Sequence, residues 1–356
     1  MSDPRPITVS DYERLAEAAC EPGHWGYVVG GAGDEITLRD NMEAFRRRAL
    51  RPRMLVDVSE VSTRTSILGS EIAMPLGVAP TSLQRVAHPD GEGALARAAA
   101  AVGTVYTLAS LASVRPRELA EAAPEALRWF QLYLSRDRGF TSELLAEAAE
   151  AGFTALVLTV DLPAAGPRER DLRSGFTLPS DTPTPNLPQE LVGTEYFHDT
   201  LGKIVDTSLT WRDLEWLRSE CRLPLVVKGI LTAEDAALAC EHGCAGVVVS
   251  NHGGRQLDGV SASLDALPEV ADAVAGRAEI YLDGGIRRGT DVAMALALGA
   301  RTVFVGRPAL WGLAAGGEAG ARHVLELFQA EIALALLLLG CPNPADVGPE
   351  HIRARG

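Results

Sequence analysis

Eight short apolar runs rich in β-branched residues recur along the chain, and they constrain its fold more than any other feature. Ala-rich segments with helical spacing separate most of them, and one of these opens with a Thr232-x-x-Asp235 capping box. Strands that are apolar along their whole length and alternate with helices indicate a parallel sheet with helices on its faces. Eight such units predict an α/β fold, a closed (β/α)8 TIM barrel, with an open doubly wound sheet as the alternative. The expected strands are Pro75–Ala79, Thr104–Leu108, Trp129–Leu134, Ala155–Val160, Leu225–Lys228, Gly246–Ser250, Glu279–Leu282 and Thr302–Val305.

Residues 1–70 are expected to form a helical extension ahead of the barrel. The segment Asp11–Cys20 is amphipathic, and Ile36–Arg48 predicts a second helix with charges on one side. Residues 24–35 between them, HWGYVVGGAGDE, are rich in glycine and are expected to form backbone turns. This stretch resembles a dinucleotide-binding loop only in part, because no strand precedes it.

The barrel itself is expected to span residues 71–345 and to close with a helix over Glu318–Leu339. Within it, the connection after the fourth strand, about residues 164–212, is unusually long and contains four prolines within ten residues. Connections of this length in a compact domain are usually lids or binding loops. The whole chain, residues 1–356, is therefore interpreted as one domain with a lid loop.

Charge and hydropathy exclude several classes of partner. The formal net charge of −14 disfavours nucleic acid and anionic membranes. The longest apolar run near the end, Ile332–Gly340, is too short to span a bilayer, and the first residues lack the pattern of a signal peptide. We expect a cytoplasmic protein that binds neither a membrane nor nucleic acid.

The cysteines indicate a reducing compartment and no metal centre. The chain has five cysteines, an odd number without the spacing of a disulfide framework. Cys240, His242 and Cys244 lie close together in sequence, but Gly243 predicts a helix end between them, so their side chains should diverge. No metal site is expected.

Polar side chains follow almost every expected strand, at the end where barrel enzymes carry their chemistry. The most informative stretch is GVVVSNHGGRQLDG, residues 246–259, where a buried strand would deliver His252 and Arg255 to one loop. An imidazole can accept a proton, and a guanidinium can bind a carboxylate. A single histidine at a strand end is more often structural, but the complementary groups at the other strand ends favour a functional role. Those groups are Pro80, Thr81, Ser82, Ser110, Gln131, Tyr133, Thr159, Asp161, Lys228, Asp283, Gly306 and Arg307.

The ends of the last two strands predict a phosphate site. DGGIRRG at residues 283–289 and VGRP at residues 305–308 combine glycines with arginines. Barrels commonly bind a phosphate at this position through backbone N–H groups and a guanidinium. A phosphate-bearing ligand is therefore expected; the alternative is that Arg287 and Arg307 form surface salt bridges.

Seven motifs in chain order carry a resemblance to a known family. They are VAPTS, FQLY, LTVD, VVKG, SNHGGRQLDG, LDGGIRRGTD and FVGRP, and the similarity extends from Tyr27 to the closing helix. Together they closely resemble the FMN-dependent α-hydroxy-acid dehydrogenases and oxidases, which include glycolate oxidase, lactate oxidase and mandelate dehydrogenase. The resemblance implies oxidation of an L-2-hydroxy acid to a 2-keto acid, with FMN reoxidised by O2, giving H2O2, or by another acceptor. It also implies a homotetramer.

The resemblance implies roles for individual residues. His252 matches the base, and Asp161 matches the carboxylate that orients it. Arg255 and Arg168 match the pair that binds the substrate carboxylate, while the hydroxyls of Tyr27 and Tyr133 contact the substrate. Lys228 matches a lysine beside the flavin ring, which the family counts among its catalytic groups. The cofactor contacts that the resemblance implies are Pro80, Thr81, Ser82, Ser110, Gln131, Thr159, Lys228, Ser250, Asp283, Gly285, Arg287, Gly306 and Arg307.

Three positions depart from the family pattern and bear on the substrate. Ser82 replaces the usual Ala or Gly, which adds a hydroxyl near the reactive edge of the flavin. Leu111 replaces a tryptophan of glycolate oxidase, in a segment that has also lost one hydroxyl, and Val28 replaces a frequent aromatic residue. These changes predict a roomier, more apolar pocket and a substrate with a medium or large apolar or aryl side chain. Leu111 joins the substrate contacts named above, and His24, Trp25, Tyr196 and Phe197 are further candidates for its wall.

Three other functions remain open at this point. One is a dehydrogenase that passes electrons to a quinone or another carrier. Another is a different FMN barrel, of the inosine-monophosphate dehydrogenase or isopentenyl-diphosphate isomerase type; the first needs a nucleophilic cysteine in a barrel loop, and no cysteine stands in such a place. The last is a catalytically silent barrel that binds FMN or another phosphate ligand, which should have lost some of the residues that this chain retains.

Overall fold

The computed structural model describes residues 6–179, 182–188 and 205–355. Eight parallel strands close into a barrel in which each strand pairs with its neighbours in chain order, and the last pairs with the first. The TIM barrel prediction is thus confirmed, and the open-sheet alternative is wrong. The barrel strands are β4 (Leu76–Val78), β5 (Val105–Leu108), β6 (Leu127–Leu132), β7 (Ala155–Thr159), β8 (Leu225–Ile230), β9 (Gly246–Val249), β10 (Glu279–Asp283) and β11 (Thr302–Val305).

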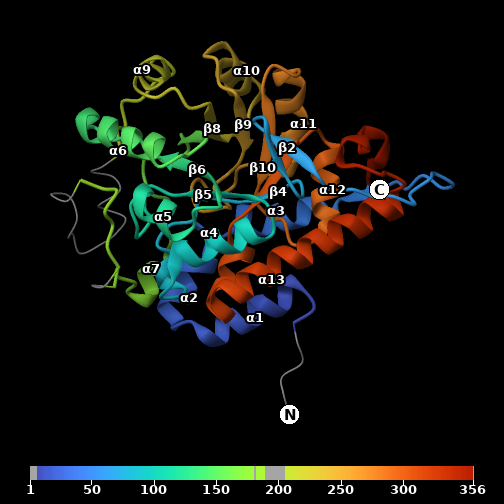
Figure 1. Ribbon diagram of the computed structural model, residues 1–356, viewed down its shortest axis with the longest axis horizontal. Coiled ribbons are helices and arrows are strands. Elements are labelled where there is room, and N and C mark those ends of the chain that lie inside the picture. The colour runs from blue at the N-terminus through green and yellow to red at the C-terminus, as the bar shows by residue number, and fades with distance from the viewer. Residues whose placement is uncertain (1–5, 180–181, 189–204, 356) are drawn as a thin grey trace.

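Helices surround the barrel, as the Ala-rich segments predicted (Figure 1). Helix α10 begins at the predicted cap, where the Thr232 hydroxyl accepts a hydrogen bond from the Asp235 N–H. The closing helix is longer than expected, because it begins at Arg307 and is interrupted by non-helical backbone at Gly316 and Gly317. The outer helices are α4 (Gly91–Ala101), α5 (Pro116–Ala122), α6 (Arg138–Glu150), α9 (Asp213–Glu220), α10 (Ala233–Glu241), α11 (Ser263–Val274), α12 (Gly289–Ala297) and α13 (Arg307–Leu339).

The N-terminal extension contains one helix more than the sequence predicted. Residues 24–35 were expected to form turns, but the first half of this stretch is helical. Pro22 occupies the first turn of this helix, which ends where Gly30 and Gly31 follow. Helix α1 packs along α13, at the lower edge of Figure 1. The elements of the extension are α1 (Val9–Ala19), α2 (Pro22–Val29), α3 (Ile36–Arg46), β1 (Arg48–Leu50), β2 (Thr65–Ile67) and β3 (Ser70–Ile72). Strand β1 pairs with β12 (Ile352–Ala354) near the other end of the chain, and short 3-10 turns lie at Gln84–Val86, Pro344–Asp346 and Pro349–His351.

The hairpin β2–β3 closes one end of the barrel. Ile67 and Ile72 are buried against the residues that fill the barrel interior, including Trp129. The backbone N–H of Leu68 donates to the carboxylate of Glu279, the first residue of β10. The boundary expected after residue 70 therefore falls inside β3, because this hairpin belongs to the barrel core. Only the carboxyl end of the strands is left for a ligand.

The described part of the long connection after β7 lies at that carboxyl end. It includes α7 (Glu169–Ser174), which packs against α2 of the extension. Val205 pairs with Ser135, which follows β6. Tyr196 and Phe197, proposed above as wall groups, lie outside the described residues. Among the helices of the described ranges, none combines the length and apolarity needed to cross a bilayer.

Candidate active site

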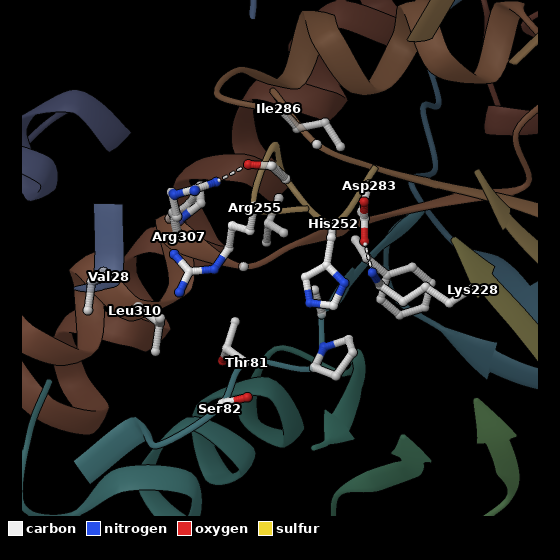
Figure 2. A pocket seen from close by; sticks show the side chains of 18 of the residues that line it. Val28, Thr81, Ser82, Lys228, His252, Arg255, Asp283, Ile286, Arg307 and Leu310 are labelled. Atoms are coloured by element: carbon white, nitrogen blue, oxygen red, sulfur yellow. Dashed lines mark hydrogen bonds and ion pairs between the residues drawn. The ribbon is translucent and has the colours of Figure 1, made fainter. Parts of the chain in front are cut away.

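A cavity of about 930 Å³, including the part open to solvent, lies at the carboxyl ends of the strands. Figure 2 shows that the side chains of His252 and Arg255 point into it, with Thr81 and Ser82 on another wall. Most of the residues predicted from strand ends meet here, although they come from both halves of the chain. Those that line the cavity are Tyr27, Val28, Pro80, Thr81, Ser82, Leu111, Tyr133, Arg168, Lys228, His252, Arg255, Asp283, Gly285, Arg287, Gly306 and Arg307.

His252 and Asp161 form a hydrogen-bonded pair. The Nδ1 atom of His252 lies 2.8 Å from Oδ1 of Asp161, and the two side chains are 17% and 13% exposed. Because a carboxylate can only accept, Nδ1 carries the proton and Nε2 is left with its lone pair. Nε2 lies 3.5 Å from the hydroxyl of Tyr133. The arrangement is that of a base held in one tautomer at the edge of a cavity.

The electrostatics of this pair favour a neutral imidazole beside a carboxylate anion. Burial lowers the pKa of His252 below its ordinary value, against the opposing charge of Asp161. Burial alone would raise the pKa of Asp161, but the charges of His252 and Lys228 lower it. At neutral pH His252 can therefore accept a proton without first losing one.

A bulge in β8 makes room for Asp161. The pairing register between β8 and β9 shifts between Lys228 and Ile230, which leaves Gly229 out of the ladder. Gly229 has φ +109°, and a Cβ there would lie 2.6 Å from the Cβ of Asp161. Only glycine fits both the backbone angle and the space, so this position holds the carboxylate close to the strand.

Two arginines and a tyrosine form the wall next to His252. Arg255 donates from one nitrogen to the carbonyls of Tyr27 and Gly30, at 2.8 and 2.9 Å, and its guanidinium lies 5.1 Å from the centre of the Tyr27 ring. The guanidinium of Arg168 lies 6.0 Å from the centre of the same ring. The Tyr27 ring also stacks on the ring of Phe176. Burial and the nearby Arg168 lower the pKa of Arg255 to about 10. Two buried guanidinium groups this close to each other favour the binding of an anion.

Arg307 and Arg287 form a second cationic region where α13 begins. Arg307 donates to the carbonyls of Gly253 and Gly30 at 3.0 and 2.7 Å, while its Nε atom is buried without a partner. Arg287 lies over the ring of Trp311 at 4.7 Å. Burial, followed by the charges of Arg255 and Arg287, lowers the pKa of Arg307 well below its usual range. Neither Arg287 nor Arg307 has an ion pair within the described residues, so the surface salt-bridge alternative is not what the structure shows. Cations at a helix N-terminus suit a phosphate.

A buried polar group lies on the remaining side of the cavity. Lys228 is 3.2 Å from Asp283 and donates to the hydroxyl of Ser250 at 2.9 Å. Burial alone would lower the pKa of Lys228, but Asp283 and Asp161 raise it above its ordinary value. Buried atoms near these strand ends that have no partner include Oδ1 of Asp283, Oδ2 of Asp161, Nε2 of Gln131 and Oγ1 of Thr159. Because buried polar groups are nearly always paired, these atoms fit a ligand that offers both donors and acceptors.

Some predicted cofactor contacts lie behind the cavity wall. The backbone N–H of Ser110 donates to Oε1 of Gln131, the Ser110 hydroxyl donates to the Gln131 carbonyl, and the same hydroxyl accepts from the N–H of Tyr133. Ser250 accepts from the N–H of His252 at 3.0 Å. These residues, with Asp161 and Thr159, are therefore placed to support the lining side chains, although they do not themselves appear on the cavity surface.

The wall has apolar members that the sequence reasoning missed. Leu162, Ile286 and Leu310 line the cavity, and each follows a barrel strand by a few residues. They have no chemical signature, and only their position after a strand could have indicated them. His24 and Trp25, which were candidates for the wall, are not among the residues that line the cavity. His24 packs edge-on against Phe176.

Comparison with known proteins agrees with this geometry. Residues 16–354 match the family described as FMN-dependent dehydrogenase. The chain is 49% identical to an L-lactate oxidase of Nostoc sp., with 96% of each chain covered, and 47% identical to 2-hydroxyacid oxidase 1 of Homo sapiens, with 96% of this chain and 94% of that protein covered. A solved structure of mandelate oxidase superposes with a TM-score of 0.92 at 40% identity, covering 98% of both chains.

Proposed function

The chain belongs to the FMN-dependent dehydrogenase family, and on this premise we propose that it is an oxidase of L-2-hydroxy acids with a medium or large apolar or aryl side chain. The products are the 2-keto acid and, with O2 as the electron acceptor, H2O2. Dependence on FMN and oxidation of a 2-hydroxy acid to a keto acid follow from the family. The proposal adds the class of side chain, the acceptor and the roles of individual residues.

The observation that carries the proposal is the unprotonated Nε2 of His252 in one cavity with the guanidinium groups of Arg255 and Arg168. A 2-hydroxy acid has a carboxylate one carbon away from the group that loses a proton. A pair of arginines binds the carboxylate, and a base next to them is then within reach of that proton. No other part of the cavity combines these two requirements within the described residues.

The residues present fit FMN. Arg287, Arg307 and the start of α13 would hold its phosphate, and Lys228 and the unpaired Oδ1 of Asp283 would meet the polar edge of its ring and its ribityl chain. When bound, FMN supplies the acceptor for the two electrons that leave the substrate. The backbone of Pro80, Thr81 and Ser82, with Gly285 and Gly306, would form the rest of this wall.

The chain's own residues then handle the proton. Arg255 and Arg168 orient the substrate through its carboxylate, and His252 accepts a proton at Nε2. Asp161 holds the ring in place and stabilises the imidazolium that results. Tyr133, whose hydroxyl lies 3.5 Å from Nε2, contacts the reacting oxygen, and Tyr27 closes the carboxylate site.

The size of the substrate pocket supports an apolar side chain. Leu111 is buried in the wall, and Val28, Leu162 and Leu310 add further apolar surface to it. Glycolate has no side chain to bury there, whereas an aryl or alkyl group would gain about 25 cal/mol for each Å² that it removes from water. Solved structures similar to this chain are of a mandelate oxidase with (S)-4-hydroxymandelic acid and related ligands.

The test is an anaerobic absorbance titration of the yellow holoprotein with glycolate, L-lactate, mandelate and 2-hydroxyoctanoate, followed by admission of air. We expect mandelate or 2-hydroxyoctanoate to reduce the flavin with at least ~10-fold higher kcat/KM than glycolate, since one to three methylenes bound in an apolar pocket are worth about that much. Glycolate as the best substrate contradicts the side-chain proposal. Slow return of the yellow colour in air favours a dehydrogenase, and a protein that no acid reduces is a silent barrel.

The pH dependence follows from the pair His252–Asp161. The base must be neutral to accept a proton, and burial lowers the pKa of His252 below its ordinary value of about 6.5. We therefore expect kcat/KM to fall only as the pH drops below about 6.5, and Asp161→Asn to move that fall to still lower pH, because it removes the charge that raises the pKa of His252. A profile of kcat/KM between pH 4.5 and 9 measures this. An acid limb above pH 6.5 contradicts it.

Assembly and location are part of the same proposal. We infer a homotetramer, which is supported by a patch of exposed apolar side chains formed by Met54, Leu55, Leu334, Leu337 and Leu338. The segment that carries Met54 contacts the end of α13 through the N–H of Arg53, which donates to the carbonyl of Leu339. All five cysteines are unpaired, which supports a cytoplasmic location.

A further inference from the structure

Two asparagines that lie 210 positions apart form a reciprocal pair beside His252. Nδ2 of Asn41 donates to Oδ1 of Asn251 at 2.8 Å, and Nδ2 of Asn251 donates to Oδ1 of Asn41 at 2.8 Å. Both side chains are at least 96% buried. Asn41 belongs to α3 of the N-terminal extension, and Asn251 precedes His252 in the loop after β9.

The amide of Asn251 uses its full hydrogen-bonding capacity. Besides the pair with Asn41, its Oδ1 accepts from the N–H of Gly254 at 3.1 Å, and its Nδ2 donates to the carbonyl of Ser261 at 3.0 Å. An amide offers two donors and two acceptor positions, and all four are taken here. The orientation of Asn251 is therefore fixed, and Asn41 supplies half of the bonds that fix it.

The loop that Asn251 organises has an unfavourable backbone. His252 has φ +59°, and Gly253 and Gly254 follow with φ +63° and +74°. A histidine in the left-handed region persists only where its surroundings hold it. Two bonds do so inside the loop, from the N–H of His252 to the Ser250 hydroxyl and from the N–H of Gly254 to Asn251. The second depends on the side chain that Asn41 orients.

Helix α3 also touches the cavity loops directly. A Cβ at Gly254 would lie 2.6 Å from the backbone N of Leu38, and a Cβ at Gly285 would lie 2.1 Å from the carbonyl oxygen of Asn41. The loops after β9 and β10 thus both approach the backbone of α3 more closely than any side chain permits. Asn41 stands between the loop of His252 and the loop of the predicted phosphate site.

We propose that Asn41 is a positioning residue for the reaction, which acts through Asn251 to hold the imidazole of His252 against Asp161 and toward the substrate. The inference rests on the proposed role of His252 as the base. It assigns to the extension a part in the chemistry that goes beyond covering the barrel.

The attachment of α3 does not depend on Asn41. At its start, Asp258 accepts hydrogen bonds from the N–H groups of Ile36 and Thr37, the latter at 2.8 Å. Beyond its end, Arg47 and Arg48 both pair with Asp265. Loss of the asparagine pair should therefore leave the helix in place and disturb only the loop of Asn251 and the N–H of Ser263, which also donates to Oδ1 of Asn41.

The test compares Asn41→Ala with Thr37→Val. Thr37 is buried one turn earlier on α3, and its hydroxyl accepts from the N–H of Gly259 at 2.8 Å. Gly259 belongs to the same connection after β9 as His252 but follows it by seven residues. We expect Asn41→Ala to lower the limiting rate of anaerobic flavin reduction about 10- to 100-fold, the range found when outer residues that orient an active imidazole are removed. The dissociation constants of substrate and FMN should stay within about threefold of wild type. Thr37→Val should lower the thermal midpoint of unfolding about as much as Asn41→Ala does. Its limiting rate of flavin reduction should stay within about twofold of wild type.

Two further variants guard against misfolding and test the coupling. Asn41→Asp keeps the acceptor for Asn251 and for the N–H of Ser263, loses the donor and adds a buried carboxylate, so it should be slowed at least ~5-fold. In the double variant Asn41→Ala, Asn251→Ala, the rate should lie within about threefold of the slower single variant, because the two act as one unit.

A wild-type rate in Asn41→Ala or Asn41→Asp overturns the inference, as does a loss that Thr37→Val shares. Reduction that slows only because FMN or substrate binds more weakly overturns it as well. If no 2-hydroxy acid reduces the wild-type protein, the proposed function fails first and this inference fails with it. If wild type is reduced and the Asn41 variants are not slowed, only the inference fails.

Discussion

Replacement of His252 is expected to lower the limiting rate of flavin reduction by about 10³-fold, while the protein stays yellow. General-base removal typically costs 10²- to 10⁴-fold, and here the imidazole is also paired with Asp161, which would stabilise its protonated form. FMN should remain bound, because the arginines proposed for its phosphate, Arg287 and Arg307, hydrogen-bond to backbone carbonyls and not to the His252 side chain. Stopped-flow absorbance under anaerobic conditions measures the rate directly.

The better substitution for this test is His252→Asn. The residue has φ +59°, and asparagine tolerates this conformation more readily than alanine does. His252→Asn therefore removes the base with little added backbone strain, and His252→Ala serves as the second variant. His242, an outer histidine at the end of α10, provides a control in His242→Ala, which should reduce at the wild-type rate. Reduction of His252→Asn within about tenfold of wild type rejects His252 as the base.

Replacement of Arg255 should mainly weaken substrate binding. Removal of one partner from a buried charge pair costs about 2–5 kcal/mol, so Arg255→Met should lower kcat/KM by about 10²-fold or more. Arg255→Lys should fall between wild type and Arg255→Met, because a lysine keeps the charge but cannot present two parallel donors. Arg255→Lys also loses the guanidinium nitrogen that donates to the carbonyls of Tyr27 and Gly30.

The measurement is the dependence of the flavin reduction rate on substrate concentration, which separates the dissociation constant from the limiting rate. A hydroxy amide of the same side chain is a useful second substrate, because wild type should discriminate against it and Arg255→Met should largely lose that preference. Arg173→Met, a change at an exposed arginine of α7, is the control and should behave as wild type. An unchanged dissociation constant in Arg255→Met contradicts the carboxylate role.

The barrel could be predicted because its signal is local. Most strands are short, largely apolar runs, and most of the helices between them repeat alanines and leucines at helical spacing, so the alternation is visible in short windows of the sequence. The polar residues at the strand ends could be placed together for a related reason, since all parallel strands of a barrel end on the same face. His252, Arg255 and Lys228 meet in the cavity as a consequence.

The features that could not be predicted depend on contacts between distant residues. In the sequence, Asn41 is one of several polar residues of an amphipathic helix, and nothing in the pattern distinguishes it. Only the fold brings it against Asn251. The bulge at Gly229 has no counterpart in the sequence pattern, because it lies against the Asp161 side chain, which follows the neighbouring strand and is distant in sequence. Helix α2 was missed for a different reason, since its glycines outweighed the helix-starting Pro22.

The carbonyl of Gly30 accepts hydrogen bonds from both Arg255 and Arg307, which follow it by 225 and 277 residues. During synthesis, residue 30 leaves the ribosome before either arginine has been added. The carbonyl of Gly30 therefore has neither of these donors until the later residues are made. Closing loops of this length is slow because their entropy is lost before the contact forms. The hydrogen bond from Arg307 to Gly30 therefore forms only after residue 307 has been added, and a chain that ends before Arg307 lacks this part of the cavity wall.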